Sequence, residues 1–374
     1  MSDDWRPGLA RATGPVYLAI ADAIAADLGS GRLAPGARLP PQRTLAQRLG
    51  IDFTTVSRAY AEARRRGLVE GRVGQGTYVL SAEPPAPRAG PVDLSMNLPP
   101  HFEDAALTAR LWREAGELQA TGLDLLLRYQ DAGGAPADRE AGALWLKDRL
   151  PDLDPERVSV CPGAQSALLA VVGTLAAPGE VICAEALTYP GLKALAAQLR
   201  VTIVGLAMDA EGILPEAFEA ACREHQVKAL CCTPTLQNPT TATMSLARRQ
   251  ALAAIARAHA VPIVEDDAYG LLPQDSPPPL AALAPELTFH IAGLAKHVSP
   301  ALRIAYLVAP DSRSGGKVRA AIRATAAMAS PLTAAVATRW ITGGAAHQVR
   351  DAIRAEARAR QRLAARLLPA GSFA

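Results

Sequence analysis

The chain has 374 residues, 49% of them hydrophobic, which exceeds the usual single domain and allows large buried cores. This composition excludes a broadly disordered protein, and no apolar run reaches the length of a membrane-spanning helix. The overall charge of +3 is too small to indicate a nucleic-acid partner by itself.

The charge is unevenly distributed. Residues 1–80 contain eleven arginines, no lysine and seven acidic residues, a net charge of +4, so the remainder is close to neutral. A small basic domain beside a large neutral one is typical of a DNA-binding head on a sensor body. An arginine- and alanine-rich proteome would give the same asymmetry, so charge alone leaves both interpretations open.

The cysteines and histidines exclude other classes of site. The five cysteines form no CxxC pair, their number is odd and no signal peptide precedes them, so we expect reduced, structural thiols and a cytoplasmic location. The six histidines show no metal-ligand spacing, so we expect no metal site.

The first eighty residues predict three helices followed by a β-hairpin. The first helix has an apolar face formed by Tyr17, Ile20, Ile24 and Leu28. A second helix covers 41–49 and ends at Gly50, which suits a left-handed residue. A third begins near Asp52, a suitable N-cap, and turns Val56, Ala59, Tyr60 and Ala63 inward. Strands at 68–72 and 77–80 would form a wing.

Such a unit places its third helix in the major groove of DNA, where early polar residues reach base edges. The predicted base contacts are Thr54, Thr55, Ser57 and Arg58. Arg38 and Arg43 would neutralise phosphates, and the small Gly74 and Gly76 would let the wing approach the duplex. A helical connector with a polar, basic surface is the alternative.

Several runs in this region resemble the winged helix of the GntR family almost from end to end. They are GRLAPGARLP from residue 31, TTVSRAY from residue 54, and GLV and GQGT from residues 67 and 74. Many relatives carry an arginine that contacts DNA where this chain has Phe53, so no base contact is transferred to that position. The resemblance implies double-stranded operator DNA as a partner.

The rest of the chain predicts a linker and an α/β domain. Residues 81–91 hold four prolines and read as a semi-rigid linker between a domain at 1–80 and another at 92–374. Helical stretches then alternate with apolar runs at 158–161, 180–183, 202–206, 229–232, 263–265, 288–291 and 305–308. This alternation predicts a mainly parallel sheet covered by helices, with ligands bound beyond the carboxyl ends of its strands.

One lysine stands out as a covalent anchor for an aldehyde cofactor. Lys147, Lys193 and Lys317 lie in helical stretches, and Lys228 precedes a strand. Lys296 alone follows a strand end. A solvated surface lysine is the alternative, and the decision depends on the polar residues that follow the other strands.

Those residues suit a phosphorylated pyridine ring. Asp266 could hold the ring nitrogen's proton, and Tyr269 and Asn238 could bind the ring hydroxyl. Tyr189 could stack on the ring. The phosphate contacts would be Gly163, Ala164 and Gln165, which open a helix, together with Arg303.

This order of motifs resembles the fold-type-I aminotransferases, and with the GntR head the chain resembles the MocR/GabR type of regulators over residues 14–370. The resemblance implies pyridoxal 5′-phosphate (PLP) held as a Schiff base on Lys296, with Asp266 at the ring nitrogen. It also implies a homodimer in which Tyr129 reaches the phosphate of the other subunit.

The chain departs from these relatives in two places. Their two serines before the lysine are Gly293 and Ala295 here. The serine that would bind the phosphate is the one replaced by Gly293, and its loss would weaken phosphate binding by about 1–2 kcal/mol. The helical stretch from residue 345 to 368 normally leads into a small C-terminal domain, which we expect to be missing. We therefore expect at most residual transaminase activity.

Three functions follow from these observations. The leading one is a DNA-binding regulator that senses PLP or a small amino compound through its aminotransferase-like domain. The second is a working aminotransferase with an incidental DNA head. The third is a regulator whose large domain is a PLP-free dimerisation scaffold.

Overall fold

The computed structural model describes residues 5–8, 14–34, 36–72, 76–80 and 96–369. The chain divides into two compact units, Met1–Ser95 and Met96–Ala374. The predicted linker at 81–91 and the tip of the predicted wing lie outside the described residues. The domain limits 1–80 and 92–374 therefore stay predictions.

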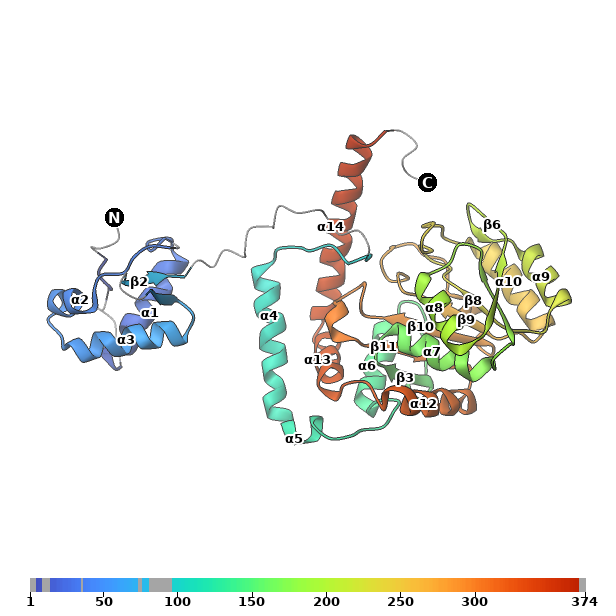
Figure 1. Ribbon diagram of the computed structural model, residues 1–374, viewed down its shortest axis with the longest axis horizontal. Helices are drawn as coiled ribbons and strands as arrows, with labels where there is room; N and C mark the ends of the chain where they lie inside the picture. The colour runs from blue at the N-terminus through green and yellow to red at the C-terminus, as the bar shows by residue number, and fades with distance from the viewer. Residues whose placement is uncertain (1–4, 9–13, 35, 73–75, 81–95, 370–374) are drawn as a thin grey trace. The chain divides into compact units, whose positions relative to one another are not determined.

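The first unit has the predicted winged helix-turn-helix architecture (Figure 1). Its elements in chain order are α1 (Val16–Gly29), α2 (Gln42–Leu49), α3 (Phe53–Arg65), β1 (Val69–Arg72) and β2 (Gly76–Val79). Gly50 ends α2 with a left-handed φ of 65°, and the Asp52 carboxylate caps α3 by accepting from the Thr54 N–H at 2.7 Å. Both local predictions are confirmed.

The core of this unit is formed by the inward faces of the three helices. Ile20, Ile24, Val56 and Ala59 are fully buried, as the helical spacing predicts. The hairpin of β1 and β2 is antiparallel, and the segment before α2 pairs with it because Leu39 N–H donates to the Thr77 carbonyl at 2.8 Å. The fold thus joins the start of α2 to the wing.

The second unit is built on a seven-stranded sheet whose order is β3-β11-β10-β9-β8-β4-β5. These strands are β3 (Val158–Cys161), β4 (Val181–Glu185), β5 (Thr202–Leu206), β8 (Val227–Cys232), β9 (Ile263–Asp266), β10 (Thr288–Gly293) and β11 (Ala305–Val308). Only β11 runs against the others, pairing antiparallel with β3 and β10. The mainly parallel sheet is confirmed. Lys228 lies within β8 and not before it, which corrects the prediction, because that strand begins at Val227.

Helices cover both faces of this sheet (Figure 1). One face packs against α7 (Ala164–Leu175), α8 (Pro190–Leu199) and α12 (Ser312–Ala326). The other face packs against two groups of helices. The first group is α6 (Pro136–Leu146), α13 (Pro331–Thr342) and α14 (Ala345–Leu367). The second group is α9 (Pro215–Glu224), α10 (Leu246–Ala258) and α11 (Leu280–Leu283). Burial on both faces explains why the strands are continuous apolar runs.

The remaining elements complete the unit. They are α4 (Ala105–Gly116), α5 (Leu123–Leu126), the 3-10 turns η1 (Glu117–Thr121), η2 (Pro155–Arg157) and η3 (Pro300–Leu302), and a small hairpin of β6 (Met208–Asp209) and β7 (Gly212–Ile213). None of the helices in the described part of the chain is both long and apolar enough to cross a bilayer.

Candidate functional site

Three predicted cofactor residues lie at or just beyond the carboxyl ends of parallel strands. Asp266 ends β9, and Lys296 lies three residues beyond β10, which is paired with β9 so that Ile291 stands opposite Asp266. Tyr189 is the N-cap of α8, four residues after β4. Since parallel strands end at one edge of a sheet, this topology gathers residues distant in sequence into one region.

Asp266 has a carboxyl oxygen without a partner. Its Oδ1 atom is shielded from solvent and receives no hydrogen bond from any described residue. Burial raises the pKa of Asp266 to about 7, and the negative charges of Asp267 and Glu185 add to this rise. A buried, unsatisfied carboxyl group costs stability, so this position is suited to a cationic or hydrogen-bonding group that enters from outside the chain.

Lys296 stands beside an open cavity. Its Nζ donates to the Asn97 carbonyl, and Asn97 Nδ2 donates to the Tyr269 hydroxyl at 2.8 Å. The cavity measures about 280 Å³, and Asn238 also lines it. Burial lowers the pKa of Lys296, which keeps more of its amine in the neutral, nucleophilic form, although Asp266 opposes this shift.

Small residues form a cradle at the start of α7. Gly163 precedes the helix with a φ of 88°, and a Cβ there would lie only 2.8 Å from Arg303 Nη2. A Cβ at Gly293 would lie 3.5 Å from the Cβ of Ala164. The free N–H groups of a helix start and an exposed arginine are suited to bind an anion. The predicted phosphate residues Gly163, Ala164 and Arg303 are therefore brought together.

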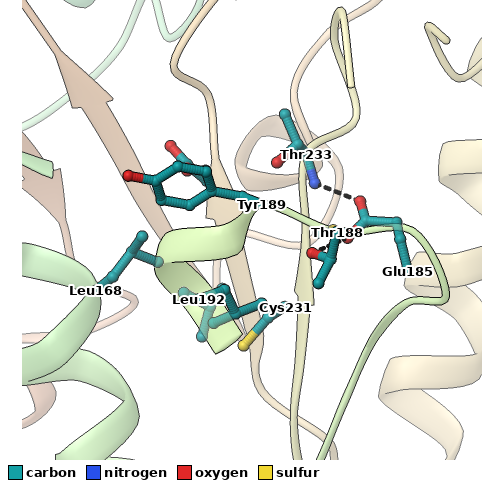
Figure 2. A pocket seen from close by; sticks show the side chains of 10 residues that line it. Leu168, Glu185, Thr188, Tyr189, Leu192, Cys231 and Thr233 are labelled. Atoms are coloured by element: carbon teal, nitrogen blue, oxygen red, sulfur yellow. Dashed lines mark hydrogen bonds between the residues drawn. The ribbon is translucent and has the colours of Figure 1, made fainter. Parts of the chain in front are cut away.

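Figure 2 shows the pocket around Tyr189, whose ring lies with Leu168 and Leu192 on one side and Glu185 on the other. The Glu185 carboxylate accepts from the Thr233 N–H at 2.7 Å and from the Thr188 hydroxyl at 3.3 Å. Burial raises the pKa of Glu185 to about 7 despite these bonds. Asp266 lines the same pocket, so a second buried carboxyl group disfavours its ionisation.

A buried polar network supports the strand end that carries Asp266. Arg149 Nε lies 3.3 Å from Asp267 Oδ2, and both side chains are almost fully buried. His290 Nδ1 lies 3.1 Å from the Glu265 carboxylate, which also accepts the N–H groups of Leu280 and Ala281. These contacts fix the residues on either side of Asp266 and leave its own Oδ1 unpaired.

Two predicted cofactor residues stand apart from this arrangement. Gln165 Nε2 donates to the Gly191 carbonyl at 2.9 Å, so its side chain holds the start of α8. Tyr129 is 88% exposed. Sequence reasoning missed Asn97 and Glu185, because Asn97 binds residues more than 170 positions away and Glu185 binds Thr233, 48 positions away.

Most of the predicted DNA-contact residues are exposed on the surface of the first unit. Arg38, Arg43, Thr54 and Arg58 are exposed, and Thr55 and Ser57 are partly exposed. The Thr54 hydroxyl donates to the Asp52 cap, and the Arg58 guanidinium lies 4.2 Å from the centre of the Tyr17 ring. Gly76 lies beside Arg38, whereas Gly74 falls outside the described residues.

Comparison with known proteins decides the family. Residues 89–367 match the model of aminotransferase class I and II, and residues 16–79 match that of the bacterial regulatory proteins of the gntR family. The chain belongs to the MocR type of transcriptional regulators. It is thus a DNA-binding regulator with an aminotransferase-like domain, and the predicted resemblance is confirmed.

The curated relatives are HTH-type transcriptional regulators. The HTH-type transcriptional regulator YdeF of Bacillus subtilis is 32% identical over 313 residues, covering 82% of this chain and 67% of its own. The HTH-type pyridoxine biosynthesis transcriptional regulator PdxR of Corynebacterium glutamicum is 28% identical, covering 76% of this chain and 64% of its own. The chain therefore spans about two thirds of the length of these relatives.

Solved structures support the fold of the second unit. An archaeal alanine:glyoxylate aminotransferase is 27% identical, with a TM-score of 0.62 over 67% of this chain and 64% of the enzyme. This likeness and the class I and II match show that the second unit of this MocR-type regulator has the aminotransferase fold.

Proposed function

We propose that the chain is an operator-binding regulator whose aminotransferase-like domain holds PLP on Lys296 and responds to PLP or to a small amino compound. The unpaired, buried Oδ1 of Asp266 carries this proposal. A protonated pyridine nitrogen would supply the partner that this carboxyl group lacks, and the pairing would offset the burial that raises its pKa.

The surrounding residues fit the remaining parts of PLP. Tyr189 offers a ring face near Asp266, and Tyr269 and Asn238 line the cavity beside Lys296. The start of α7 and Arg303 offer a cradle for the phosphate. When bound, PLP supplies an aldehyde to which a primary amine attaches covalently. Lys296 contributes that amine, and burial favours its neutral form.

The visible absorption spectrum of the full chain with PLP tests the cofactor proposal. We expect a yellow band that disappears on addition of borohydride, because hydride reduces the C=N bond and leaves the cofactor fixed to the lysine as a secondary amine. Peptide mass spectrometry should locate the modification on Lys296. Lys296→Ala should lose the band and keep its far-UV circular dichroism. Lys193→Ala, which changes an exposed lysine of α8, should keep the band. Wild-type protein without a band, or with PLP fixed onto another lysine, would contradict the proposal.

The alternative function is that of a PLP-free scaffold, and two residues favour it. Gly293 and Ala295 stand where relatives have serines, and the change at Gly293 removes a hydroxyl that would bind the phosphate. This alternative expects sequence-specific DNA binding with no absorption band and no effect of PLP on the affinity. An operator affinity that changes when PLP is added would exclude it, because a scaffold has no differential affinity for the cofactor.

We also propose that the chain is a homodimer in which Tyr129 completes the phosphate site of the other subunit. Its exposed position suits a partner contact. Size-exclusion chromatography with light scattering should give twice the chain mass of 39.1 kDa. Tyr129→Phe should weaken PLP binding about tenfold, as expected for one lost hydrogen bond to a charged group. Unchanged PLP affinity would remove Tyr129 from the site.

A further inference from the structure

Phe53 is an exposed aromatic residue at the start of α3. The residue is 43% exposed, whereas the apolar residues that α3 contributes to the core are buried. Core packing therefore gives no reason for a phenyl ring at this position. The first turn of the recognition helix is the part that meets base edges in a helix-turn-helix complex.

The ring borders a preformed cleft of about 290 Å³ between α2, α3 and the wing. Arg43 Cζ lies 5.8 Å from the centre of the Phe53 ring, a cation–π distance, and the exposed Arg38 stands on the wing side. The Tyr60 hydroxyl donates to the Pro40 carbonyl at 2.8 Å, and this bond holds the segment between Arg38 and Arg43 against α3. The cleft thus combines one apolar surface with two cations on a fixed backbone.

The side chains that line this cleft indicate which part of a DNA duplex it would contact. In the major groove the exposed apolar group of a base pair is the C5-methyl of thymine, and phenylalanine is among the side chains that contact it. The two arginines suit the flanking phosphates. We propose that Phe53 packs on a thymine methyl group and so specifies a T·A pair in each operator half-site. This proposal rests on the operator-binding function proposed above.

The test begins with selection of an operator from a random duplex library by the full chain. Each thymine of the selected site is then replaced singly by deoxyuridine, which removes only the methyl group. Affinity is measured by fluorescence anisotropy at one salt concentration. At one thymine in each half-site, we expect the replacement to weaken wild-type binding about fourfold, the effect of burying one methyl group. Phe53→Ala should bind the thymine duplex more weakly and show no response to deoxyuridine.

Two variants control the experiment. Phe53→Leu keeps an apolar side chain and should retain part of the deoxyuridine response. Leu246→Ala changes a residue of 41% exposure at the first position of α10, and should retain all of it. The proposal is wrong if no thymine methyl matters to the wild type, or if the response persists in Phe53→Ala. If no sequence is enriched, operator binding itself fails, which separates the two failures.

Discussion

Asp266→Asn should stabilise the cofactor-free protein at neutral and higher pH. Burial, reinforced by Asp267 and Glu185, raises the pKa of Asp266 from 3.8 to about 7. A carboxyl group whose pKa is higher in the folded chain favours folding below its unfolded pKa, and this contribution is lost as the pH rises toward 7. A rise of about 3 pKa units corresponds to about 4 kcal/mol of unfolding free energy, lost between about pH 4 and pH 7.

Urea denaturation of the cofactor-free protein between pH 4 and pH 8 measures this effect. Tryptophan fluorescence reports mainly on the second unit, which holds Trp112, Trp145 and Trp340. The free energy of unfolding should fall more steeply with pH in wild type than in Asp266→Asn. Asp152→Asn controls for the removal of one exposed carboxyl group. Parallel pH profiles for wild type and Asp266→Asn would refute the reasoning, since they would mean that the fold does not disfavour the charge of Asp266.

Three further outcomes are expected. Arg149→Met should lower the unfolding free energy measured in urea by about 3–5 kcal/mol, because the buried Asp267 carboxylate would lose the Arg149 guanidinium. Adding Asp267→Asn to this variant should recover part of that loss. Tyr60→Phe should cost about 1 kcal/mol, seen as a lower melting temperature of the first unit, since it removes the bond to Pro40. Arg43→Ala should weaken binding to all DNA duplexes and reduce the slope of log affinity against log salt concentration by about 1. An unchanged slope would mean that Arg43 does not contact a phosphate.

Local patterns were enough to predict the architecture. Helical spacing identified the inward residues of α3, and single residues such as Gly50 and Asp52 marked where helices end or begin. The alternation of strands and helices predicted a mainly parallel sheet, and hence an edge at which Lys296 and Asp266 would meet. These features depend on neighbours a few positions away along the chain, so one sequence contains all the information they need.

The chemical state of the candidate site depends on contacts across the chain. Asn97 lies 199 residues from Lys296 and 172 from Tyr269, so no motif spacing could reveal that it binds both. The high pKa of Asp266 likewise arises from burial and from Glu185 on another strand. By itself, the sequence determined the two-unit organisation, the family and most candidate residues. Only the tertiary structure decided which polar atoms are already satisfied and which remain open to a ligand, because hydrogen bonding and desolvation depend on every group that packs nearby.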